Sequence, residues 1–263
     1  MGTAGIRTAG AALGAIWRDG RKIERTAYAV GAVLFLSGFM TAVVLLLTGG
    51  SWLGPVSLRK AVTFGLSFGL TLISVAWATS YVKMRPVLRR PLLGVFTGAC
   101  VAEVTLVSMQ AWRRVPSHFN FETGFDTAVS MTLAAGGAVI ILTLLCFTVA
   151  AMADPRVLSP SMRLAVRFGL LVLLVALATG AVMIARGVVL ARGGEPQLAY
   201  TTAGSLKPLH AVAMHAILVL PGLAWLLRFT RWDERRRLRI VWLAVAADAV
   251  LTTVVGIASF TGW

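Results

Sequence analysis

Apolar residues fill seven long stretches of the chain, and short polar segments separate them. Each stretch is close to the roughly 20 residues that an α-helix needs to cross the hydrocarbon core of a membrane. None shows the alternation of apolar and polar positions that is typical of a membrane β-barrel. The pattern predicts an all-α, polytopic transmembrane helix bundle with seven spans, over about residues 28–49, 61–82, 92–112, 127–152, 163–186, 209–228 and 240–260.

Composition supports a membrane protein. The chain has 263 residues, of which 58% are hydrophobic and 13% are charged, and its mean hydropathy is +0.83. A soluble domain of this composition would expose too much apolar surface. We therefore expect a multi-pass protein of the cell inner (plasma) membrane.

The positive charges predict how the spans are oriented. Of the 25 Lys and Arg residues, 18 lie at the N-terminus or beside the links that share its side of the membrane. By the positive-inside rule, this places the N-terminus in the cytoplasm and the C-terminus outside. The 18 residues are Arg7, Arg18, Arg21, Lys22, Arg25, Lys83, Arg85, Arg89, Arg90, Arg156, Arg163, Arg167, Arg228, Arg231, Arg235, Arg236, Arg237 and Arg239.

The net charge of +15 could also indicate nucleic-acid binding, but the basic segments lack the interleaved aromatic residues that stack on bases. We expect no nucleic-acid partner and instead expect anionic lipids at the cytoplasmic face. The segment 1–26 can place Ile6, Leu13, Ile16 and Trp17 on one helical face. It is predicted to be a cytoplasmic interfacial segment before one transmembrane domain over 27–263.

Three ionisable residues, Glu103, His215 and Asp248, are predicted to form a central polar site. At about 1.5 Å of rise per residue, all three fall in the middle third of their spans. A charge at this depth is costly, so such residues usually face the bundle interior or a water-filled cavity. The alternative is a buried hydrogen-bond network that only fixes how the helices pack.

A second polar layer is predicted nearer the outside. Gln110 follows Glu103 by seven residues and shares its face, and Arg114 continues that line. His210 lies at a similar level, and His118 follows in the outer link. The functional interpretation is a ligand mouth above Gln110 and His210. The alternative is a loop held by a helix cap at Thr123 or Asp126.

Two further patterns concern the faces of the spans. The second span carries a mildly polar stripe of Lys60, Phe64, Ser67, Thr71 and Ser74. In the same span, a GxxxG pair at 65–69 permits close helix packing. The fifth span is almost wholly aliphatic and is expected to be the most lipid-facing.

His210 and His215 are five residues apart, which places them about 140° apart around a helix. They cannot hold one metal ion as histidines four residues apart do, and no metal site is predicted. Whether a cofactor is bound stays open.

Two stretches, "QAWRRVPSHFN" at 110–120 and "LHAVAMHAILVLP" at 209–221, together resemble an uncharacterised family of multi-spanning bacterial integral membrane proteins. The resemblance implies that Gln110, His118, His210 and His215 belong to one pattern, and it implies no activity. Two departures stand out, because Arg114 replaces a Gly of the family pattern and Ile217–Leu218 stand around an expected Gln.

Three functional hypotheses follow. The first is proton-coupled translocation of a small solute or ion through the central polar site. The second is a haem- or metal-binding redox protein that uses His118, His210 or His215, which requires the outer link to fold inward because two axial ligands must lie at matched depth. The third is a packing or assembly subunit with no site.

Overall fold

A computed structural model describes residues 3–153, 159–202 and 204–261 of the chain. These residues form helices and no strand, and seven of the helices are long and apolar enough to span a membrane, as the sequence predicts. Arg156 lies outside the described residues. The helices are α1 (Thr3–Asp19), α2 (Lys22–Leu47), α3 (Arg59–Ser80), α4 (Pro86–Trp112), α5 (Gly124–Ala153), α6 (Pro160–Arg192), α7 (Pro196–Thr202), α8 (Lys207–Leu227) and α9 (Glu234–Thr261).

Local sequence sets several of the helix ends. Both α4 and α6 begin at a proline, which has the backbone angle of a first helical turn and needs no hydrogen-bond partner there. The hydroxyl of Ser159 accepts a hydrogen bond from the amide of Met162 and caps α6. The short helix α7 was not predicted and lies in the longest link between spans.

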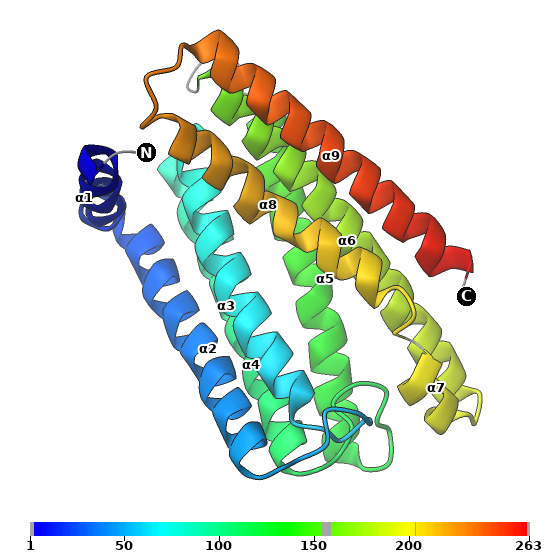
Figure 1. The fold of residues 1–263 in the computed structure, drawn as a ribbon. Coiled ribbons are helices and arrows are strands. Elements are labelled where there is room, and N and C mark those ends of the chain that lie inside the picture. The colour runs from blue at the N-terminus through cyan, green and yellow to red at the C-terminus, as the bar shows by residue number, and fades with distance from the viewer. Residues whose placement is uncertain (1–2, 154–158, 203, 262–263) are drawn as a thin grey trace.

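The spans form two groups (Figure 1). Helices α2, α3, α4 and α5 pack on one another, and α6, α8 and α9 form the second group. The groups meet mainly where α3 contacts α8 and where α5 contacts α6. We call the end at which α3, α5 and α8 begin the lower end, and the end at which α2, α4, α6 and α9 begin the upper end, as they lie in Figure 1.

Helices α2 and α3 pack so closely at their glycines that the backbone of one contacts the backbone of the other. A Cβ atom on Gly65 would lie 2.5 Å from the Cα of Gly38, and one on Gly69 would lie 2.5 Å from the amide nitrogen of Phe35. No side chain fits between helices that approach this closely, so the GxxxG pair of α3 serves packing, as expected.

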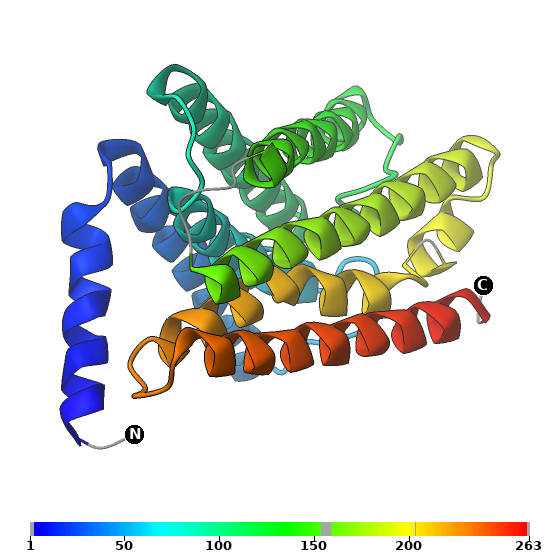
Figure 2. The ribbon, with the colours of Figure 1, turned by 90° about the horizontal axis from the view of Figure 1, so that it is seen from above.

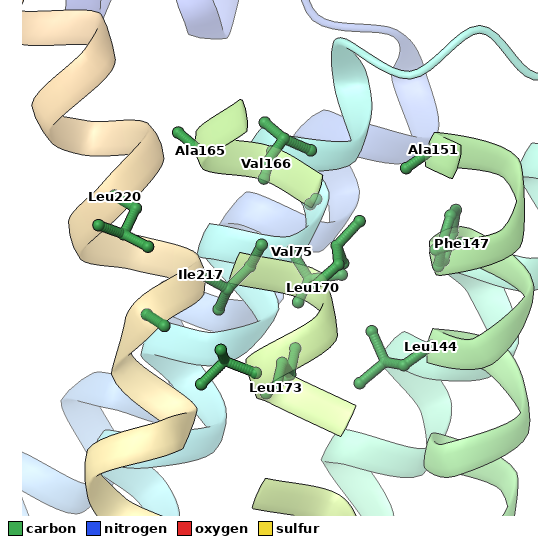
Figure 3. Close-up of a cluster of buried hydrophobic side chains, with 14 of the residues drawn as sticks. Val75, Leu144, Phe147, Ala151, Ala165, Val166, Leu170, Leu173, Ile217 and Leu220 are labelled. Carbon is green, nitrogen blue, oxygen red and sulfur yellow. The ribbon is translucent and has the colours of Figure 1, made fainter. Parts of the chain in front are cut away.

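Helix α6 lies at the centre of the second group, and the prediction that it is the most lipid-facing span is wrong. Figure 3 shows Val166, Leu170 and Leu173 of α6 between side chains of α5 and α8. Its small residue Gly169 lets the backbone of α8 come close at Ile217. The most exposed span is α9, where few residues are buried.

Helix α1 lies at one edge of the bundle, level with the upper end of α2, and runs crosswise to the spans instead of along them (Figures 1 and 2). Ala12 and Ile16 pack against the core, while Trp17 is exposed. This orientation fits the interfacial helix that the sequence predicts for this segment.

Candidate functional site

A small groove with polar and apolar walls lies between α3 and α8. Its pocket is lined on the α3 side by Ser67, Leu70, Thr71 and Ser74, and on the α8 side by Met214, His215, Ile217 and Leu218. The hydroxyl residues belong to the stripe that the sequence shows on α3. The stripe therefore faces a neighbouring span and not the lipid.

His215 is the only titratable side chain of this pocket lining. Its Nδ1 lies 2.5 Å from the carbonyl oxygen of Ala211, one turn earlier in α8. A carbonyl oxygen only accepts hydrogen bonds, so Nδ1 carries the proton and Nε2 of the neutral ring keeps its lone pair. The side chain is exposed at the edge of the groove. It can therefore accept a proton or a hydrogen bond from a solute.

Aromatic rings fill the space between α3 and α8 at the upper end. The rings of Trp77 and Trp225 meet edge to face with centroids 6.4 Å apart. Tyr81 contacts Trp77, and Phe229 contacts Trp225, in similar edge-on arrangements. These four rings hold the two helices together where they come closest (Figure 1).

At the lower end, the link between α4 and α5 folds inward over the groove. The ring of His118 lies 5.7 Å from that of Phe64 on α3. The ring of Phe119 occupies the space that a side chain on Gly187 of α6 would need. The amide of Asn120 donates to the hydroxyl of Ser130 on α5. The link is thus anchored on three helices.

His118 has an unusual electrostatic environment. Burial, together with the positive charges of Lys60 and Lys207, lowers the pKa of its imidazole to about 3. The ring is therefore neutral at pH 7, and its Nδ1 lies 3.0 Å from the hydroxyl oxygen of Ser117.

The structure separates the three residues predicted to form a central site. Glu103 is buried, and its Oε1 lies 2.7 Å from the position of a Cβ atom on Gly136, so its carboxyl group occupies the α4–α5 contact. Asp248 lies on α9, which packs on α8 and α6. His215 faces α3. The depth estimate did not reveal this, because helices α4 and α9 belong to different groups.

Asp248 nevertheless faces protein. It lies on the stripe of α9 that carries the buried residues Val245 and Gly256. Within the described residues, its Oδ2 atom and the Oγ1 atom of Thr252, one turn away, are buried without a hydrogen-bond partner.

The structure places His210 against a neighbouring helix, α6. Its Nδ1 donates to the carbonyl oxygen of Ala176 on α6 over 2.6 Å. The ring also fills the space above Gly180, where a Cβ atom would lie 3.3 Å from its Cε1. His210 is a packing residue between α6 and α8, and the histidine beside the pocket is His215.

Gln110 and its neighbours form a network that joins α4 to α5. Gln110 is fully buried and donates to Oδ1 of Asp126 over 2.8 Å, and Arg113 donates to the same oxygen over 2.7 Å. The hydroxyl of Thr123 donates to the other carboxylate oxygen. Asp126 thus anchors the first turn of α5, as the capping alternative for this link predicts.

Arg113, and not Arg114, continues the line of Gln110. Helix α4 ends at Trp112, and the amides of Arg114 and Val115 donate to the carbonyl oxygens of Ala111 and Gln110. This is a Schellman ending, in which the residue after the cap is left-handed. Arg114 has a φ of 58° and is exposed. The resemblance places a Gly at this same position.

Sequence reasoning missed an ion pair at the upper end. Arg89 of α4 contacts Glu24 of α2, and it also donates to the carbonyl oxygens of Thr79 and Val82 at the end of α3. From the sequence, Arg89 was assigned only as one of the positive charges on the cytoplasmic side. Its position seven residues before Phe96, and fourteen before Glu103, could have assigned it to the buried face of α4.

Among the described residues, no group of three or more His, Cys, Asp or Glu side chains could hold a metal ion. Comparisons with protein-family models, with curated proteins and with solved structures found no match. The seven long apolar helices of the described residues identify the chain as a multi-pass integral membrane protein.

Proposed function

We propose that the protein moves a small solute together with protons along the groove between α3 and α8. The single observation that carries the proposal is the pocket that sets His215 opposite Ser67, Thr71 and Ser74. Polar residues in a span usually mark the path of a substrate or proton, because burying them in lipid has a cost.

A different structure closes each end of the groove, and this arrangement suits translocation. Four aromatic rings close the upper end, and the inward-folded link with His118 covers the lower end. A solute at His215 would lie between these two barriers. An imidazole that can bind and release a proton there provides the coupling.

We further propose that the upper end faces the cytoplasm of an inner (plasma) membrane, where its basic residues attract anionic lipids. A reporter enzyme that is active only outside the cytoplasm, fused at the C-terminus, should be active. An inactive reporter, together with activity of the same reporter at the N-terminus, would overturn this orientation.

Proton movement in reconstituted vesicles tests the function. A pH-sensitive dye inside the vesicles should report faster proton movement than in protein-free vesicles when one of a panel of neutral, cationic and anionic solutes is added. His215→Gln should abolish this movement. His210→Gln is the matched control, since that ring bonds α6 outside the pocket, and it should keep the movement.

Three outcomes would overturn the proposal. One is wild-type vesicles that move protons no faster than empty ones with every solute. Another is a His215→Gln protein that transports as well as the wild type. The third is a haem absorption band in the purified protein, which would favour the redox alternative.

A further inference from the structure

Two lysines stand at the lower ends of two facing helix stripes. Lys60 begins the α3 stripe that continues through Phe64, Ser67 and Thr71. Lys207 begins the corresponding stripe of α8, since Met214 and Leu218 of the pocket follow it at helical spacing. The positive charge of Lys207 acts on Lys60, and that of Arg59 acts on both lysines. Three cationic side chains thus converge at the lower end of the groove.

The partial charges of two helix N-termini add to the positive charge of this cluster. Both α3 and α8 begin here, and a helix N-terminus carries a partial positive charge. Neither helix has an acidic residue in its first turn, and the side chains of the N-cap residues Leu58 and Leu206 form no cap. At the start of α3, the hydroxyl of the neutral Ser57 accepts a hydrogen bond from the amide of Arg59. By contrast, α5 begins at the same end with Asp126 in its first turn. An acidic residue thus compensates the N-terminus of α5, whereas cationic residues flank those of α3 and α8.

No carboxylate in the described part of the chain forms an ion pair with Arg59, Lys60 or Lys207. Gathering like charges at two helix N-termini is unfavourable, because the partial charge of each terminus is also positive. The cluster is also accessible, since Lys207 is exposed and Arg59 and Lys60 are half-buried. An anion from outside the chain would relieve the repulsion.

We propose that Arg59, Lys60, Lys207 and the neutral imidazole of His118 bind a phosphate group at the lower mouth of the groove. Helix N-termini and lysines are both common phosphate-binding elements, the lysines acting as point charges. The phosphate group belongs either to free phosphate or to the headgroup of an anionic lipid. The proposal rests on the proposed function for the role of the groove, and if the ligand is free phosphate, the transported solute is an anion.

Binding of inorganic phosphate to the purified protein in detergent is the first test. At constant ionic strength, phosphate should raise the unfolding temperature of the wild-type protein more than chloride does. Lys207→Gln and Lys60→Gln should each weaken this apparent affinity by about tenfold or more, which corresponds to about 1.4 kcal/mol. Lys207 is exposed, so its variant should fold even if the Lys60 variant does not.

Two variants separate a specific site from other effects. Arg114→Gln removes one exposed positive charge from the same end and should leave phosphate binding unchanged. His215→Gln should bind phosphate as well as the wild type even when it transports nothing, so the binding site and the proposed transport can fail separately. Equal weakening by Arg114→Gln and Lys207→Gln would overturn the proposal, because it would indicate a general charge effect.

Lipid nanodiscs distinguish the two sources of the phosphate group. If free phosphate has no effect but phosphatidylglycerol copurifies with the wild type and not with Lys207→Gln, the ligand is a lipid headgroup. If free phosphate binds as described above, the ligand is the free anion. If neither probe depends on Lys60 or Lys207, the site does not exist.

Discussion

The guanidinium group of Arg89 lies 3.3 Å from the carboxylate of Glu24, and both side chains are almost completely buried. Glu24 also accepts hydrogen bonds from Arg21, and Arg89 donates to two carbonyl oxygens at the end of α3. One residue of α4 therefore ties together the ends of α2 and α3.

Loss of one member of this pair should be strongly destabilising. Without Glu24, the buried guanidinium group of Arg89 has no counter-ion, and without Arg89, Glu24 keeps only Arg21 while two carbonyl oxygens at the end of α3 lose their donor. Glu24→Gln and Arg89→Met should each lower the free energy of unfolding by about 3–5 kcal/mol. SDS titration of the protein in mixed micelles measures this. The exposed neighbour Arg90 provides the control, and Arg90→Met should change the free energy by less than about 0.5 kcal/mol. Equal effects of the two arginine variants would contradict this role of Arg89.

The glycine contact between α2 and α3 should tolerate no side chain. A Cβ atom on Gly65 would meet the backbone of Gly38, so Gly65→Ala should force the helices apart and cost about 1–3 kcal/mol. A Cβ atom on Gly98, on an exposed face of α4, would meet no other atom within 4 Å. Gly98→Ala should be neutral or should stabilise by up to about 1 kcal/mol, from helix propensity alone. Thermal unfolding of both variants compares them directly, and a stable Gly65→Ala protein would refute the close contact.

The end of α4 should accept a glycine. Arg114 adopts a left-handed backbone that costs a side-chain-bearing residue about 1–2 kcal/mol, and glycine recovers part of this at an entropic cost. Arg114→Gly should therefore raise the free energy of unfolding by about 0.5–1 kcal/mol. Arg113→Ala should instead lower it by about 1–3 kcal/mol, since the buried oxygen atoms of Gln110 and Asp126 would each lose the guanidinium donor. If the two substitutions had effects of the same sign, the assignment of the two arginines would be wrong.

His118 should make the protein less stable in mild acid. Its pKa of about 3 lies below the value of about 6.5 in an unfolded chain, so between these pH values the unfolded state binds more protons. The stabilisation is complete above pH 6.5 and is lost as the pH falls. From pH 7 to pH 5, His118 should account for about 1–2 kcal/mol of lost stability.

Unfolding curves at pH 7, 6 and 5 test this pH dependence. His118→Gln, which does not titrate, should remove the contribution of His118, so the slope between pH 5 and pH 6.5 should differ between the variant and the wild type. An unchanged slope in the variant would show that another group is responsible.

The seven spans could be predicted because a run of about 20 apolar residues is a local property of the chain. The cap of α5 at Asp126 was also visible, since Thr123 and Asp126 are close in sequence. Which spans pack against one another is not a local property, so it could not be predicted in this way. Glu103 and Asp248 have similar predicted depths, yet they lie on helices of different groups.

The histidines are a second case in which the sequence does not determine the contacts between helices. Their spacing fixes the 140° between His210 and His215, but not which ring faces α6 and which faces the groove. The polar stripe of α3 was visible in the sequence. The facing stripe of α8 was not, because Ala211, Met214 and Leu218 resemble any lipid-facing residues. Only the packing of α8 on both α3 and α6 assigns a role to each ring.

The glycine contacts also determine how the molecule can move. Helices α2 and α3 meet backbone to backbone, and so, at Gly169, do α6 and α8. Pairs packed this closely cannot slide or rotate independently, so each pair moves as a rigid body. Relative movement of these two pairs then falls on the contact between α3 and α8. A rocking motion about the aromatic contact of Trp77 and Trp225 would widen the lower mouth of the groove while its upper end stays shut.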